Sequence, residues 1–520
     1  MTHSEGAKPG FVGRVWENAR EHASNAVVGG AILVVTGFTP EHWVAEILHA
    51  VHLSDVRSQL PSVIDGRLLV LSFGVVIIVG DVLWRKHRPR AARASVSPAT
   101  VAAVIEGVSS EKSASLAPDF LPLPDKPSIA VLPFQNMSGD LEQDYFADGI
   151  VEDIITDLSK ISGLMVISRS STLTYKGKAL DAKQVGRDLG VRYVLEGSVR
   201  KAGNRVRITG QLIDAVTSGH LWAERYDRDL TDIFEIQDDV TRRIIDALKV
   251  TLSPAENAQI AHSGAHNIDA YDYFLRGREF LLGENKNREK FELSLKLFTK
   301  ALELDPNYSQ AYAGLSWAYN FDYSNRWSDN PDNSLQVAKH NADLAIQKDP
   351  NEPLAHFVAS LAAMFGKDLD RAKAEAENAL SLNPNFALAY ATLGAICTYL
   401  GQPLAAIPAI ERAMRLDPAW SQQYLHFLGT AYLLAGKYET AATLLRRRVL
   451  LVPGTDLTRA ILASALGHLD EIDEARRVWR ELKEINPKYS FSEHFARQPF
   501  KREEDVRRIA EGLVKAGLPT

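Results

Sequence analysis

Four carboxylates fall within one predicted helix, residues 144–161, and are the first candidates for chemistry. Asp148, Glu152, Asp153 and Asp157 are separated by one to four residues. Carboxylate oxygens at such spacing could bind a hard cation. A run of acids at helical spacing more often forms a solvated face. We therefore expect a solvated acidic face here and no metal site.

Other reactive residues lack the sequence context that catalysis requires. Lys176-Gly177-Lys178 has no glycine-rich phosphate loop, and Arg169 to Thr172 is expected to form a polar turn after a strand. Cys397 is predicted to be a small buried core residue. The sequence has no Ser/His/Asp order, HExxH motif or Walker motif. We expect no catalytic residues, no metal and no cofactor.

The elements around these residues are organised by a ladder of prolines. Successive intervals are 44, 34, 34, 35 and 34 residues, and a period of 34 in a helical stretch indicates an array of helix pairs. Asp or Asn, which favour turns, precede five of the six prolines. The prolines are Pro306, Pro350, Pro384, Pro418, Pro453 and Pro487.

Small residues recur at two fixed distances before these prolines. Twelve residues before each proline stand Ser294, Ala338, Ala372, Ala406, Ala441 and Ala475. Five residues before it stand Ala301, Ala345, Ala379 and Ala413, followed by Arg448 and Leu482 in the last two units. Small residues there would let the two helices of one unit pack closely.

This pattern resembles the tetratricopeptide repeat over residues 270–490, which implies an all-α superhelix of six repeats. By the family's pattern, first helices line an inner wall that binds a protein or peptide partner. The candidate wall residues are mostly apolar and aromatic, with no basic cluster to clamp a terminal carboxylate. For any one of them burial between helices is the commoner outcome, so the prediction rests on the set. They are Trp317, Asn320, Phe321, Phe357, Leu361, Tyr399, His426 and Leu433.

Two departures from the repeat are expected to matter. The 44-residue step contains about ten extra residues, 322–331, predicted to form a loop beside the wall where partner choice could be set. Residues 491–520 are expected to cap the array. Within them, 503–515 form an amphipathic helix that covers the last repeat.

Length and charge set limits on the whole chain. With 520 residues, two or three domains are expected. The net charge of −6 gives no electrostatic footprint for nucleic acid, so no nucleic-acid partner is expected. A single cysteine excludes an intramolecular disulfide framework and suits a reducing compartment.

Residues 1–90 are predicted to anchor the chain in a membrane. The apolar run 68–84 would span about 25 Å as a helix, and the shorter run 26–38 is a second candidate. Basic residues follow at once, from Arg85 to Arg93, and favour a cytoplasmic C-terminal side. We expect residues 91–520 on the cytoplasmic side of a bacterial inner membrane, with residues 91–126 as a flexible linker.

Residues 127–255 alternate between strand and helix patterns, which predicts an α/β domain. A strand is expected at 128–134, a helix at 144–161 and a second strand at 164–168. Residues 191–195 and 205–209 alternate around Gly203-Asn204, a hairpin signal. A strand at 220–226 leads into a helix at 233–250.

The runs SIAVLPFQNMSGD, LGVRYVLEGSVRKAGNRVRITGQLID and HLWAERYDRDLTDIFEIQDDV resemble the TolB-like amino-terminal domain, which is related to FlgO-type domains. In rhizobial relatives this domain often precedes tetratricopeptide repeats. It follows either a class III adenylate cyclase domain or a winged-helix DNA-binding domain of the CadC type. The resemblance implies a non-catalytic sensor or interaction module.

Three functions remain open at this point. The first is a membrane-anchored scaffold that presents the TolB-like domain and the repeats to cytoplasmic partners. The second is a regulatory relative of class III adenylate cyclases without the catalytic domain. The third is a membrane-bound transcription regulator of the CadC type without a DNA-binding domain. The sequence leaves the partner, the signal and the oligomeric state undetermined.

Overall fold

The computed structural model describes residues 121–520, apart from 141–142, 179–180, 255, 258–266 and 283–286. All described residues belong to one contact unit, Ser115–Thr520. The predicted membrane anchor and most of the predicted linker lie outside them. No helix within the described ranges is both long enough and apolar enough to cross a membrane.

The first part of this unit is a mixed sheet in the order β3-β1-β4-β5-β6, with β2 also paired to β4. Pairing of β1 with β3 and β4 is parallel, whereas β4, β5 and β6 are antiparallel. The strands are β1 (Ser128–Val131), β2 (Gln135–Asn136), β3 (Met165–Val166), β4 (Tyr193–Ala202), β5 (Arg205–Asp214) and β6 (His220–Asp229).

Local sequence explains two features of this domain. The β4–β5 hairpin turns at Gly203-Asn204, as predicted, and Gly203 has φ 60°, a conformation that glycine adopts without a steric penalty. Helix α8 (Ala182–Leu189) begins where the Asp181 carboxylate accepts from the Lys183 amide. It ends at Gly190, which is also left-handed.

Two long helices pack on one face of the sheet: α6 (Asp144–Ser159) and α9 (Ile233–Leu248). Their apolar sides share a core with inward-facing residues of β4 and β5, including Leu195, Val206 and Ile208. The alternation of buried and exposed residues along β5 places its arginines on the opposite face.

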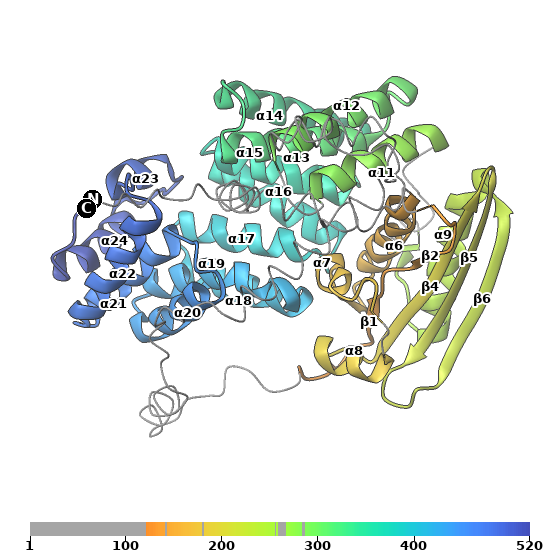
Figure 1. Ribbon diagram of the computed structural model, residues 1–520, viewed down its shortest axis with the longest axis horizontal. Helices are drawn as coiled ribbons and strands as arrows, with labels where there is room; N and C mark the ends of the chain where they lie inside the picture. Colours follow the sequence, from red (N-terminus) through yellow and green to blue (C-terminus); the bar gives the residue numbers. More distant parts are fainter. Residues whose placement is uncertain (1–120, 141–142, 179–180, 255, 258–266, 283–286) are drawn as a thin grey trace, which may run out of the picture. The chain divides into compact units, whose positions relative to one another are not determined.

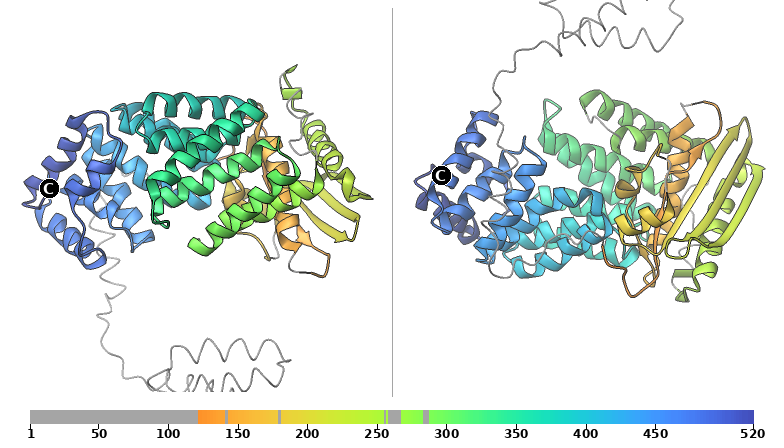
Figure 2. Two further views of the ribbon diagram at one scale, coloured as in Figure 1. Left: turned by 90° about the horizontal axis from the view of Figure 1, so that it is seen from above. Right: turned by 60° about the horizontal axis from the view of Figure 1, so that its bottom comes forward.

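Helix pairs make up the rest of the described chain, and Figure 2 shows them in sequence order from green to blue. Six consecutive pairs are present in the described ranges, followed by α23 (Phe491–Arg497) and α24 (Glu503–Lys515). The pairs are α11 (Ile268–Leu282) with α12 (Arg288–Leu304), α13 (Ser309–Asn325) with α14 (Pro331–Lys348), α15 (Pro353–Phe365) with α16 (Leu369–Leu382), α17 (Ala387–Tyr399) with α18 (Pro403–Leu416), α19 (Ser421–Leu434) with α20 (Tyr438–Leu451), and α21 (Leu457–His468) with α22 (Ile472–Ile485).

The small residues predicted at two positions of each pair are buried. Every one is fully inaccessible to solvent, and so is Leu482. Arg448 is the exception at 8% exposure, in a place where four of the other pairs have alanine. Five of the six second helices end at the Asp or Asn before the proline, and α20 ends at Val452 instead. For example, the Asp349 amide bonds to the Ala345 carbonyl, and the Asp349 carboxylate accepts from the Asn351 amide.

The predicted insert at 322–331 is a loop only in its second half: residues 322–325 belong to α13, and residues 326–330 connect it to α14. Compared with the next pair, α13 and α14 are each four residues longer, and their connection is two residues longer. Asp322 is fully buried in α13, where it accepts from the Ser328 amide at 2.7 Å and from the hydroxyl of Ser334. The extra residues therefore extend both helices and lengthen the loop between them, in which Asn330 caps α14.

The prediction of a solvated acidic face on α6 is also wrong. Helix α11 covers this face, and Arg278 contacts the carboxylates of Asp153 (3.3 Å) and Glu152 (3.2 Å). The hydroxyl of Tyr271 donates to Asp153, and burial raises the pKa of Asp153 despite Arg278 nearby. Asp148 is 7% exposed and pairs with Lys176 at 2.8 Å. Glu152 and Asp153 therefore serve packing between the sheet domain and the first helix pair, whereas Asp148 and Asp157 pair with Lys176 and Lys160 within the sheet domain.

The segment after β3 likewise differs from the expected polar turn. Residues Arg169–Leu173 form a short helix, α7, in which Ser171 and Thr172 are fully buried. The Ser171 hydroxyl donates to the Asp417 carboxylate at 2.6 Å, and Asp417 directly precedes one of the ladder prolines. This turn is therefore a contact with the helix pairs.

The sheet domain packs against the turns between successive helix pairs. The Asn385 side-chain amide lies 3.0–3.3 Å from the carbonyl oxygens of Ser159, Ile161 and Leu164. One turn further along the array, Arg415 donates to the Gly190 carbonyl at 2.7 Å. The turns that the prolines define are therefore the edge on which the sheet domain rests.

We predict that Asn385→Ala lowers the free energy of unfolding by about 3 kcal/mol, because it removes a side-chain donor shared by three carbonyl groups in a buried contact. Asn351→Ala is the matched control: Asn351 is the residue after Pro350, as Asn385 is after Pro384, but its side chain is exposed. Urea unfolding followed by tryptophan fluorescence measures both variants. Equal stability of the two would contradict the role given to Asn385.

Candidate functional site

A pocket lies on the surface shared by the first helices α17, α19 and α21, called here the inner wall. It comprises about 380 Å³ of empty space, including the solvent at its mouth. Aromatic, aliphatic, hydroxyl, imidazole and amide side chains line it. These are Ala395, Thr398, Tyr399, His426, Phe427, Thr430, Leu457, Ile461, His494, Phe495, Gln498 and Phe500.

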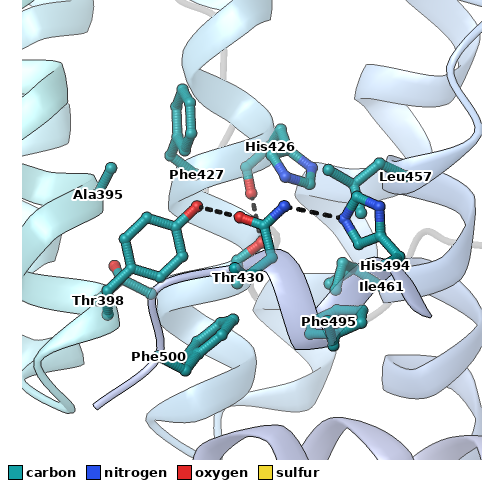
Figure 3. Close-up of a pocket in the computed structure, with 12 residues that line it drawn as sticks. Ala395, Thr398, His426, Phe427, Thr430, Leu457, Ile461, His494, Phe495 and Phe500 are labelled. Carbon is teal, nitrogen blue, oxygen red and sulfur yellow. Dashed lines mark hydrogen bonds between the residues drawn. The ribbon is translucent and has the colours of Figure 1, made fainter. Parts of the chain in front are cut away.

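The last four lining residues belong to a part of the chain that lies across the inner wall. We call Ser490–Arg502, which contains α23, the crossing segment. The Tyr399 hydroxyl donates to Gln498 Oε1 at 3.0 Å, and Gln498 Nε2 lies 3.1 Å from His494 Nε2. Figure 3 shows these bonds together with His494, Phe495 and Phe500 around the pocket.

The wall also contacts the backbone of the crossing segment. The Lys501 amide donates to the Tyr399 carbonyl at 2.9 Å. The rings of Tyr399 and Phe500 meet edge to face, with centroids 5.0 Å apart. Thus one wall residue offers a hydroxyl, a ring face and a carbonyl, which together suit a peptide.

Burial keeps the titratable groups of this site neutral. It lowers the pKa of His426 to about 4, with the guanidinium of Arg448 and the ring of His494 adding to the effect. It lowers the pKa of His494 as well and raises that of Tyr399 to about 12. At neutral pH these groups act as neutral hydrogen-bonding partners.

Arg448 is an unusual neighbour of this wall. Its Nη2 donates to Gln423 Oε1 at 3.0 Å, but Nε and Nη1 have no hydrogen-bond partner within the described ranges. His426 bonds instead through Nδ1 with the Thr458 hydroxyl, 3.2 Å away. A buried guanidinium beside an imidazole disfavours a second positive charge on that imidazole.

Of the predicted wall residues, the pocket brings together Tyr399 and His426. Three others form an aromatic cluster elsewhere: the ring of Trp317 is 5.3 Å from Phe357 and 6.1 Å from Phe321. Trp317 and Phe357 are buried in it, at 9% and 3% exposure.

The remaining three predicted residues lie outside the pocket. Asn320 is buried and donates to the Val358 carbonyl at 3.3 Å, while Leu361 is partly buried against the same core. Leu433 is fully buried in the C-terminal core with α24. These side chains pack between helices.

Some lining residues that the sequence analysis missed had a detectable signal. Ile461 follows His426 by 35 residues, the local repeat interval, so register alone would have added it to the set. Phe495 and Phe500 had no such signal, because they follow the last repeat. Their position on the wall depends on the path of the chain after α22, which returns across the first helices.

The site offers binding groups, and within the described residues no cluster of His, Cys, Asp and Glu is arranged to hold a metal ion. A second, smaller pocket lies between α6 and α11, lined by paired charges that include Arg278 and Glu152. Those charges already serve the packing of the sheet domain.

Comparisons with known proteins identify two parts of the chain. Residues 125–245 match the family described as the second domain of HilA/YgeH-like transcriptional regulators, and residues 387–419 match the tetratricopeptide repeat. The helix pairs are therefore tetratricopeptide repeats, and the sheet domain is HilA-like.

One curated relative is a protein of Rhizobium meliloti (strain 1021) named "Putative adenylate cyclase 3". It is 51% identical over 251 residues, which cover 48% of this chain and 42% of that protein. The chain thus spans less than half the length of this relative.

Solved structures show more distant likeness. YrrB, described as a TPR protein with an unusual peptide-binding site, has 20% identity and a TM-score of 0.30, covering 38% of this chain and 97% of that one. Pseudomonas aeruginosa PilF has 16% identity and a TM-score of 0.35, covering 44% and 96%. TolB from Acinetobacter baumannii has 22% identity and a TM-score of only 0.18, covering 25% and 30%.

We predict that His426 makes the fold less stable in mild acid. Its pKa is near 6.5 when unfolded and about 4 when folded, so the unfolded chain binds the extra proton between these values. Stability is therefore lost as pH falls below 6.5, by about 2 kcal/mol at pH 5.

The measurement is urea unfolding at pH 7 and pH 5. His426→Gln, which cannot be protonated, should reduce the loss by about that amount, whereas His340→Gln on the exposed side of α14 should not. The same pH dependence in wild type and His426→Gln would show that His426 does not cause it.

Proposed function

We propose that this protein is a non-catalytic scaffold that holds a peptide segment of a partner protein on the inner wall of its repeats. The observation that carries the proposal is that the hydroxyl, ring and carbonyl of Tyr399 each contact the chain's own crossing segment. Such a combination binds a peptide through its backbone and its side chains together.

The lining of the pocket indicates which peptides fit. None of its twelve side chains, all in described residues, is Lys, Arg, Asp or Glu. The imidazoles of His426 and His494 favour the neutral form. A segment with apolar side chains and neutral hydrogen-bonding groups therefore has the smallest desolvation cost when it enters this pocket.

The sheet domain would serve this scaffold as a fixed second module. Its contacts through Arg278 and Asn385 join it to the repeats along a different set of residues from those of the wall. We propose that it acts as a non-catalytic sensor or interaction module, as its resemblance to TolB-like domains implies. The sheet domain and the wall could then hold two partners at a fixed distance and orientation.

We further propose that residues 1–90 anchor the scaffold at the inner face of a bacterial cytoplasmic membrane. The support is the apolar run 68–84 and the basic residues directly after it. Release of the full chain from membranes by alkaline carbonate, without detergent, would contradict the anchor.

A second candidate function is a regulatory part of an adenylate cyclase system. The relative named as a cyclase favours it, since about half of this chain is shared with that protein. On this proposal the chain acts through a cyclase partner without making cyclic AMP. Purified full-length protein with ATP and Mg²⁺ or Mn²⁺ should form none, and turnover would overturn both non-catalytic proposals.

The scaffold proposal predicts position-specific crosslinking in cells. A photoreactive benzoylphenylalanine in place of Phe427, which lines the pocket, should crosslink the chain to one discrete partner. The matched control is the same residue in place of Leu450, 79% exposed on α20 away from the pocket.

The crosslink at position 427 should weaken several-fold when Tyr399 is changed to Ala, because the hydroxyl and ring contacts are lost. Immunoblots of the full chain measure both crosslinks. Equal crosslinking from positions 427 and 450, or no effect of Tyr399→Ala, would argue against the wall as the binding surface.

A further inference from the structure

We infer that the crossing segment, Ser490–Arg502, is an internal ligand of the inner wall, which a partner peptide of similar chemistry must displace. The inference rests on the proposed function, since it concerns regulation of the same wall. The expected partner is a short amphipathic helical segment with two aromatic side chains one turn apart. After them in its sequence come a residue with a side-chain amide and a third aromatic residue.

The crossing segment has the form of a bound peptide. Phe491 and Phe495 stack with centroids 4.3 Å apart, each 6% exposed, and Phe500 lies 5.9 Å beyond Phe495. On the other side of α23, Glu493 and Arg497 are exposed. One face of a single short helix thus faces the repeats while its other face remains in solvent.

The polar contacts at the exposed edge of the crossing segment are weak. Lys501 pairs with Asp370 at 3.1 Å, but both side chains are more than half exposed. Lys367 and Arg502 donate to the carbonyls of Ala496 and Gly401 at exposed sites, at 3.2 and 3.1 Å. Exposed ion pairs contribute little. Seven residues are also too few for a helix that is stable alone, so α23 depends on its phenylalanines for its place.

Helix α24, by contrast, is held independently of the crossing segment. The Ser464 hydroxyl donates to the Ile509 carbonyl at 2.7 Å, and Ile509 and Leu513 are fully buried. Gly467 of α21 lies against the backbone of Gly512, so any side chain at 467 would collide with it. Helix α24 thus keeps its own contacts with α21 when α23 leaves, and displacement uncovers only that part of the C-terminal apolar cluster that Phe491 and Phe495 cover.

The pocket shows that the internal ligand fits the wall incompletely. Space remains among Phe427, Thr430 and Ile461 next to the crossing segment. A partner that reproduces the aromatic contacts and also fills this space would bury more apolar surface than the segment does. Such a partner can displace a ligand that has the advantage of being covalently attached.

The test measures binding of a labelled synthetic peptide, residues 489–502, to the full chain by fluorescence anisotropy. Phe495→Ala combined with Phe500→Ala should weaken the internal segment and tighten binding of the free peptide by about tenfold or more. Arg497→Ala, on the exposed side of α23, is the matched control and should bind the peptide as weakly as wild type does. Adding Tyr399→Ala to the double variant should abolish the gain.

Equal affinity of wild type and the double variant would overturn the inference. Hydrogen exchange on the unaltered chain gives a second test that does not depend on variants folding. Amides of Phe491–Arg497 should exchange faster than those of α24, and exchange of both at one common rate would also overturn it.

These outcomes separate the inference from the proposed function. If no partner crosslinks at position 427 but the double variant binds the peptide tightly, only the scaffold proposal fails. If a partner crosslinks there but the peptide binds all variants equally, only the internal ligand fails.

Discussion

Close approach of helices at fully buried small residues is the constraint on which the rest of the structure depends. Ala406 and Ala413 of α18, both without exposed area, let α17 and α18 pack tightly. First helices meet the same constraint with glycine: a Cβ at Gly429 would lie 2.6 Å from Cγ of Leu445. Because each pair packs in this way, the first helices α17, α19 and α21 form one continuous surface, and the wall exists only through that repetition.

The same repetition creates a second, separate contact. Five of the six pairs end at an Asp or Asn before the proline, and Asn385 and Arg415 fix this edge of the array to the sheet domain. Residues of the wall lie on first helices, whereas Asn385 lies in a turn between pairs and Arg415 lies in the last turn of the second helix α18. One array therefore presents two surfaces that do not compete. This arrangement explains why the sheet domain can be buried deeply against the repeats without covering the wall.

Periodic features of this fold were predictable and contacts between distant segments were not. The proline ladder and its small residues gave the helix pairs, and Gly203-Asn204 gave the hairpin. The acidic face of α6 was misjudged because Arg278, its partner, lies 125 residues after Asp153 and outside the predicted domain. Likewise Leu433 follows His426 by two turns of α19, yet α24 covers the end of that helix. A pattern within one helix does not reveal which later segment will cover it.

One of the two breaks in the small-residue rule, Arg448, brings the packing and the chemistry of the wall together. Arg448 stands where alanine fits in four other pairs, and two of its nitrogens have no partner in the described residues. Its charge next to His426 helps hold that imidazole neutral. A neutral imidazole, bonded to Thr458, leaves the wall without a titrating charge at physiological pH. The departure from the repeat thus costs packing at one position and gives the pocket an environment suited to uncharged peptide groups.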